Sequence, residues 1–144
     1  MQIKEVQSRE EVSETYKVLL QIYDNLNQET YVDDILNMMQ RGYRMAAVFE
    51  NPEIEDGRCI GVVGIYITKR LNYGKVTEIE DFMIDRAKRN IGVGKMLLRW
   101  VEWQTAVFEC DNIVGTLETK RLPSQKIFSR EKFTVDGFFF RKSS

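Results

Sequence analysis

A glycine loop and a run of carboxylates just ahead of it are the parts of this sequence that could do chemistry. Residues Arg89 to Gly94 read Arg-Asn-Ile-Gly-Val-Gly and stand between a strand-like run at 77–84 and an amphipathic helix that begins near Gly92. Glycines at such a junction let backbone N–H groups approach a ligand with no Cβ in the way. The positive end of the helix dipole would face the same point, so the sequence predicts a phosphate-binding loop.

The carboxylates Glu78, Glu80 and Asp81 lie on the strand that leads into this loop. In a regular strand Glu78 and Glu80 share one face and Asp81 points to the other. A bulge, which is common beside active sites, would change that arrangement. The chain contains no histidine, which excludes Ser-His-Asp and Cys-His catalysis and His-based zinc sites. A general base would have to be a carboxylate, a lysine, a tyrosine, a cysteine or the chain terminus.

Composition places the chain among soluble globular proteins. Its 144 residues are 43% hydrophobic and 30% charged, which predicts a single domain over residues 1–144. No apolar run approaches membrane-spanning length, and the first residues lack a signal-peptide core. We therefore expect a cytoplasmic location and no membrane partner. Cys59 and Cys110 are expected to be free, unreactive thiols.

Charge is unevenly distributed along the chain. Residues 1–50 carry five Lys and Arg against nine Asp and Glu, whereas residues 86–144 carry twelve against six. This asymmetry suggests an anionic ligand on the C-terminal half and a cationic one near the N-terminal half, although chance scatter of surface charge would look the same. Nucleic acid is not expected as a partner, because the basic residues are dispersed and the calculated pI is about 5.6.

Hydrophobic periodicity and turn residues predict an α/β (α+β) fold with a mixed sheet, in which an antiparallel meander precedes parallel crossovers. Strands are expected at 3–6, 43–50, 58–68, 76–84, 112–119 and 134–141. Helices are expected after Ser8, at 30–40, after Gly92 and at 123–132. A polar turn at 51–57 would join two of the strands.

Two familiar phosphate-binding motifs do not match the loop. A Walker loop needs Ser or Thr after its Gly-Lys pair, and Met96 stands there. The dinucleotide fingerprint needs a small residue where Leu97 stands, and its strand normally opens a parallel sheet rather than following a meander.

The remaining pattern, Arg-x-x-Gly-x-Gly after an antiparallel strand, resembles the acyl-CoA site of the GNAT superfamily of N-acetyltransferases. The resemblance covers nearly the whole chain and implies helices on both faces of the sheet. It implies acetyl-CoA as cosubstrate and no metal. The pyrophosphate would be held by Arg89, Asn90, Ile91, Gly92, Val93, Gly94 and Lys95, and the pantetheine and thioester by backbone groups of Met83 and Ile84.

Within the superfamily, residues 77–142 look most like aminoalkylphosphonate acetyltransferases. The supporting stretches are 78–81, 92–95, 120–121 and 138–142. This closer likeness implies no particular substrate.

The resemblance implies Glu78 as the general base, with Glu80 and Asp81 as further candidate carboxylates. Many members protonate the departing thiolate with a tyrosine, and Phe128 occupies that position here. Arg121 stands where the superfamily often has Asn, and Lys132 where it often has Gly. Without the tyrosine, water or the proton already taken from the amine could quench the thiolate. Phe128 could instead pack against the pantetheine or acetyl group.

An acceptor amine would enter past the first pair of helices, where Tyr23, Asp24 and Tyr31 lie. Acidic and aromatic side chains suit an ammonium group, although they could also be core and solvent-facing residues. The sequence thus favours an acetyltransferase acting on a small primary amine. A non-catalytic acyl-CoA-binding regulatory module and a protein or peptide N-acetyltransferase are the alternatives. The aromatic run 138–140 could form a homodimer contact or belong to the core.

Overall fold

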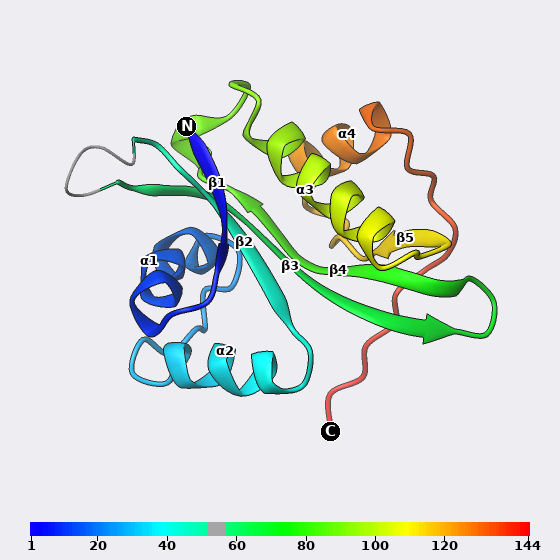
Figure 1. Ribbon diagram of the computed structural model, residues 1–144, viewed down its shortest axis with the longest axis horizontal. Helices are drawn as coiled ribbons and strands as arrows, with labels where there is room; N and C mark the ends of the chain where they lie inside the picture. The colour runs from blue at the N-terminus through cyan, green and yellow to red at the C-terminus, as the bar shows by residue number, and fades with distance from the viewer. Residues whose placement is uncertain (52–56) are drawn as a thin grey trace.

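A five-stranded sheet in the order β1-β2-β3-β4-β5 runs through the middle of the molecule (Figure 1). The structure is a computed structural model and describes residues 1–51 and 57–144, so most of the predicted turn at 51–57 lies outside the described residues. The strands are β1 (Gln2–Val6), β2 (Arg44–Phe49), β3 (Cys59–Arg70), β4 (Gly74–Ile84) and β5 (Asn112–Gly115). The first four strands pair antiparallel and β5 joins β4 in parallel, which confirms the predicted mixed sheet.

Helices cover both faces of this sheet (Figure 1). Helices α1 (Arg9–Leu20) and α2 (Tyr31–Gln40) lie on one face, and α3 (Val93–Val107) and α4 (Leu122–Arg130) on the other. A single 3₁₀ turn, η1 (Arg86–Lys88), links β4 to the glycine loop. None of the helices in the described part of the chain is long and apolar enough to span a membrane.

The sheet is buried on both faces, which explains the continuous apolar runs of its central strands. On β2, Met45 and Ala47 pack toward α1 and α2, while Ala46 and Val48 pack toward α3. All four side chains are fully buried. The two resulting cores hold the loop and the carboxylates at the same end of β4.

A bulge in β4 sets the direction of the carboxylates. Asp81 pairs with Gly64 of β3 and Ile79 pairs with Ile65, so Glu80 is an extra residue without a partner. Ile79 and Phe82 therefore both point into the core beneath α3. Asp81 points to the opposite face, where its carboxylate meets Tyr23 and Tyr43. The structure thus has the bulge that the sequence analysis left open, and Asp81 lies on the same face as Glu78 instead of the opposite face expected for a regular strand.

Strands β4 and β5 separate after the bulge. β5 pairs only with Val76–Ile79 and ends at Gly115, four residues earlier than predicted. Residues 80–84 of β4 consequently have no β5 partner. The two strands diverge at the carboxylates and open a cleft between β4 and α4.

The predicted last strand at 134–141 is wrong, because residues 133–144 form no regular secondary structure. Phe138, Phe139 and Phe140 are 89%, 74% and 86% exposed, which rules out the core alternative. Three consecutive apolar side chains cannot all face one core from a strand, in which successive residues alternate sides. The segment leaves α4 and runs past the β3–β4 hairpin, where Tyr73 donates a hydrogen bond to Asp136 (Figure 1).

Candidate active site

A cavity of about 650 Å³ lies where the end of β4, the start of α3 and α4 meet. The predicted residues that line it are Met83, Ile84, Arg89, Asn90, Gly92, Val93, Gly94 and Lys95. Ile91 is half-exposed and does not line it. The fold thus brings eight of the nine predicted acyl-CoA residues to one cavity.

The loop makes its turn through two left-handed residues, Asn90 with φ 67° and Gly92 with φ 90°. Asparagine and glycine tolerate that conformation better than other residues, so Asn90 serves where glycine is commoner. Gly92 is the N-cap of α3 and supplies no side-chain cap. The N–H groups of the first turn are therefore left open toward the cavity, as an anion site requires.

Gly94 has a role in helix packing in addition to the backbone access that its place in the motif suggests. A Cβ at this position would lie 2.9 Å from Ile84 Cδ1 and 3.0 Å from Ile127 Cδ1. Its absence lets α3 pack closely against β4 and α4. Gly94 therefore sets the width of the cavity through helix packing as well as through access to the backbone.

The cavity is cationic. Four basic residues that line it have no carboxylate within 4.0 Å in the described part of the chain: Arg89, Lys95, Lys126 and Arg130. Lys88 is different, because it pairs with Glu50 at 2.5 Å. Lys126 and Arg130 were missed by the sequence reasoning, although their spacing of four residues places them on one face of α4. Their charges suit a ligand that carries several phosphates.

Glu78 and Glu80 form a pair of neighbouring carboxyl groups beside the bulge. Arg70 donates a hydrogen bond to Glu78 at 2.9 Å. When protonated, the Glu80 carboxyl donates a hydrogen bond to the Glu78 carboxylate, and this bond, burial and the nearby negative charges raise the pKa of Glu80 to about 7. The bond to Glu80 and the guanidinium of Arg70 hold the pKa of Glu78 below its ordinary value. Near neutral pH the pair can therefore exchange a proton with a ligand.

Asp81 accepts hydrogen bonds from two tyrosines, Tyr23 at 2.7 Å and Tyr43 at 2.6 Å. Burial and the charge of Asp81 raise the pKa of both phenols, so they remain protonated donors. The structure therefore brings Tyr23 to the carboxylates. Tyr31 lies close enough to Asp81 for that charge to add to the effect of burial in raising the pKa of its phenol. Tyr31 is buried and its hydroxyl bonds Thr15 at 2.6 Å, whereas Asp24 is exposed.

Tyr43 and Tyr66 are site residues that sequence reasoning missed. Their rings pack 5.3 Å apart beside Asp81. Tyr43 stands at the start of an apolar strand, where it looks like an ordinary core residue. Only the pairing of β2, β3 and β4 shows that its hydroxyl crosses β3 to reach Asp81.

Phe128 is part of the core. Its ring is 5.1 Å from that of Phe82 and 4.7 Å from that of Phe133, and it does not line the cavity. The alternative that it packs against the pantetheine or acetyl group therefore gains no support from this arrangement.

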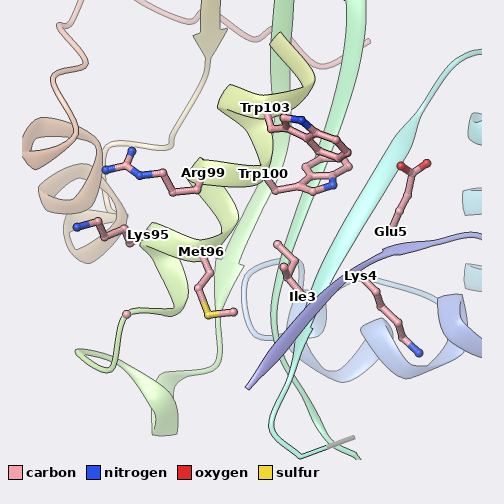
Figure 2. Close-up of a pocket in the computed structure, with 9 residues that line it drawn as sticks. Ile3, Lys4, Glu5, Lys95, Met96, Arg99, Trp100 and Trp103 are labelled. Carbon is pink, nitrogen blue, oxygen red and sulfur yellow. The ribbon is translucent and has the colours of Figure 1, made fainter. Parts of the chain in front are cut away.

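A second hollow, of about 690 Å³, lies on the other side of α3. Figure 2 shows that Ile3 of β1 faces Met96 and Trp100 of α3 across it. It shares Gly92 and Lys95 with the cationic cavity. Its walls are mainly apolar.

Comparison with known proteins supports an acyltransferase and gives the family. The chain belongs to the acetyltransferase (GNAT) family, whose model matches residues 12–133. The uncharacterized N-acetyltransferase YhdJ of Bacillus subtilis is 25% identical over 144 residues, which is 97% of this chain and 96% of the relative.

Solved structures show the same fold. A ribosomal-protein-alanine N-acetyltransferase from Brucella melitensis has a TM-score of 0.80 at 13% identity, with full coverage of both chains. The aminoglycoside N-acetyltransferase AAC(6')-Iy in complex with CoA has a TM-score of 0.79 at 18% identity and covers 99% of this chain and 95% of its own. These likenesses establish the fold alone. The closer resemblance to aminoalkylphosphonate acetyltransferases stays a prediction.

Proposed function

We propose that this protein transfers the acetyl group of acetyl-CoA to the primary amine of a small molecule. The observation that carries the proposal is the course of β4. Its bulge holds Glu80 and Asp81, and three residues further on Met83 and Ile84 line the cationic cavity. A thioester in the cavity would therefore lie next to carboxylates.

The cavity fits the coenzyme part of acetyl-CoA. The open N–H groups at the start of α3 and the four free cations would hold its phosphates. The edge of β4 at 80–84, which β5 does not cover, would offer backbone groups other than the Phe82 carbonyl to the amides of the pantetheine. We propose no metal for this reaction.

Amide formation requires a neutral amine, since an ammonium has no lone pair. Alkylamines have a pKa near that of lysine, about 10.4, so a base must remove a proton. The amine nitrogen then bonds the acetyl carbon, the carbon–sulfur bond breaks, and the electron pair leaves with sulfur. We propose the Glu78–Glu80 pair as this base. Glu78 remains the candidate from the resemblance, and Glu80 is supported by its pKa, while Arg70 forms its ion pair with Glu78.

The acceptor side of the site is acidic and aromatic. Tyr23, Tyr66, Glu80 and Asp81 gather there, opposite the cations of the coenzyme cavity. Negative charge and π-faces favour an ammonium-bearing substrate. We propose that the amine enters from this side.

Release of free thiol from acetyl-CoA, followed across a panel of amines and peptides, tests the proposal. Release that depends on small amines, above the rate of hydrolysis, is expected. Release only with peptides would favour the protein-directed alternative. Calorimetric binding of acetyl-CoA without any release would favour the regulatory module, and absence of both binding and release would overturn the coenzyme site itself.

We further propose a homodimer that covers Phe138, Phe139 and Phe140. Support comes from their exposure, because such apolar runs rarely remain in water. Light scattering of the purified protein and of a Phe139→Ser variant tests it: the variant is expected to shift to monomer, and a monomeric parent protein would contradict it.

A further inference from the structure

Arg121 is a half-buried cation without an anionic partner. It is the N-cap residue of α4, and no carboxylate lies within 4.0 Å of its guanidinium among the described residues. Burial lowers its pKa, although Tyr23, Glu118 and Asp81 oppose that effect. Arginine nevertheless stays charged. Desolvated charges are normally paired, so this position implies an anion that the protein binds only part of the time.

The guanidinium lies between β4 and the start of α4, next to two residues that line the coenzyme cavity although Arg121 itself does not line it. One nitrogen, Nη2, donates to the backbone carbonyl of Phe82 and to Ser124 Oγ at 3.0 Å, and contacts Met83 Sδ at 3.8 Å. Met83 and Ser124 both line the coenzyme cavity. Tyr23 and Asp81, on the acceptor side, are close enough to influence its charge. Arg121 thus stands where the two halves of the site meet.

The other two nitrogens, Nε and Nη1, have no hydrogen-bond partner in the described part of the chain. They are not sealed from solvent either, since the only fully buried side-chain nitrogen or oxygen there without a partner is Arg44 Nη1. Nη2 anchors the group to β4, which leaves two nitrogens with three N–H donors for a ligand.

We propose that the Arg121 guanidinium binds the coenzyme A sulfur as it becomes a thiolate. The inference rests on the proposed function. When the carbon–sulfur bond breaks, the electron pair stays on sulfur, and the fixed cation stabilises that charge without transferring a proton. The proton taken from the amine leaves the carboxylate for water, and water later protonates the thiolate. Arg121 is then the catalytic residue that makes a tyrosine at position 128 unnecessary.

The experiment measures the pKa of the thiol of bound coenzyme A. The ultraviolet absorbance of the thiolate is titrated in the complex with CoA, and the complex with desulfo-CoA serves as the blank. The protein's own Cys59 does not interfere, because burial raises its pKa to about 12. The expected thiol pKa in the complex is about 1 to 3 below that of free CoA, as for other groups beside an opposite charge.

Two substitutions of Arg121 and one control separate charge from structure. In the Arg121→Gln variant, the thiol pKa of bound CoA is expected to return most of the way to that of free CoA. Arg121→Lys keeps a cation, so much of the lowering of the thiol pKa should remain. The matched control is Arg130→Gln, which should weaken CoA and desulfo-CoA equally and leave the thiol pKa unchanged. The kcat of Arg121→Gln is expected to fall about 10²- to 10³-fold, as for loss of one charge-stabilising donor.

The inference is overturned if the thiol pKa of CoA bound to the unsubstituted protein equals that of free CoA. This test does not depend on any variant folding correctly. It is also overturned if Arg121→Gln titrates like the parent. Either result leaves the coenzyme site standing. Failure of the parent protein to bind both CoA and desulfo-CoA would instead overturn the proposed function.

Discussion

The hydroxyl of Tyr43 donates a 2.6 Å hydrogen bond to Asp81. Tyr43 directly precedes β2 and Asp81 lies in β4, so strand β3 lies between the two residues in the sheet. The hydroxyl passes over Gly64 of β3. A Cβ on Gly64 would lie only 1.7 Å from Tyr43 Oη. The acceptor side of the site thus depends on a residue with no side chain.

Replacement of Gly64 by alanine is therefore expected to displace Tyr43 and free the Asp81 carboxylate. The cost in unfolding free energy should be about 1–3 kcal/mol, typical of overpacking, and the KM for the amine should rise. Urea unfolding and steady-state kinetics measure the two effects. Gly137→Ala is the matched control, because a Cβ there meets nothing within 4 Å. Equal stability of the two variants would contradict the role of Gly64.

The pH dependence of activity should report the Glu78–Glu80 pair. A base acts when deprotonated, and the pKa of Glu80 is about 7, so kcat/KM should rise with pH through about 7 and be lost below it. The control is to repeat the pH profile with amines of different basicity. If the titrating group belongs to the enzyme, the midpoint stays the same for all of them. A midpoint that follows the amine would contradict the assignment.

Substitution distinguishes the two glutamates. Glu80→Gln is expected to lower kcat by about 10²- to 10⁴-fold and to remove the rise near pH 7. Glu78→Gln removes the neighbouring negative charge, which is one of the causes that raise the pKa of Glu80, so the midpoint should move to lower pH with activity retained. If Glu78→Gln abolishes activity and Glu80→Gln does not, Glu78 is the base.

The loop should tolerate glycine at position 90 but not valine. Asn90 has φ 67°, a conformation that costs a β-branched residue about 1–2 kcal/mol. Asn90→Gly should keep the affinity for CoA, and Asn90→Val should weaken it about 5- to 30-fold. Calorimetry with CoA measures both. Equal affinities would show that the left-handed turn is not needed for binding.

Asp85 should stabilise the entry to the loop in a pH-dependent manner. Burial opposes its ionisation, but the Ala87 N–H at 2.9 Å and Arg58 at 2.5 Å hold its pKa below the ordinary value. Because the folded pKa is lowered, the stabilisation is present above the unfolded value of about 3.8 and disappears as pH falls through the folded value. Asp85→Asn should cost about 1–3 kcal/mol at neutral pH and progressively less in acid. Unfolding curves across pH test this, and a constant difference would contradict it.

A tyrosine at position 128 should not speed the reaction. Phe128 packs against Phe82 and Phe133 and does not line the cavity, so the new hydroxyl would be buried among aromatic rings. We expect kcat of Phe128→Tyr to stay the same and stability to fall by about 1–3 kcal/mol for the unpaired hydroxyl. Thiol-release kinetics and thermal unfolding measure these effects. A higher kcat would mean that thiolate protonation limits the parent enzyme.

Local features of the sequence were the most predictable part of the site. The left-handed turn at Asn90 and Gly92 and the start of α3 depend on residues within a few positions of one another. Alternating and continuous apolar runs likewise predicted β1 to β4. The last strand was mispredicted because a strand also needs a partner, and partners are distant in sequence.

The sequence by itself determined that a phosphate-binding loop follows a carboxylate-bearing strand, since glycine geometry and strand periodicity are properties of short segments. Only the tertiary structure decided which side chains meet there. The bulge at Glu80 directs Asp81 toward Tyr43, and packing of α4 against β4 puts Arg121 beside Phe82. Those contacts join residues that are 38 or 39 positions apart, and no local pattern specifies them.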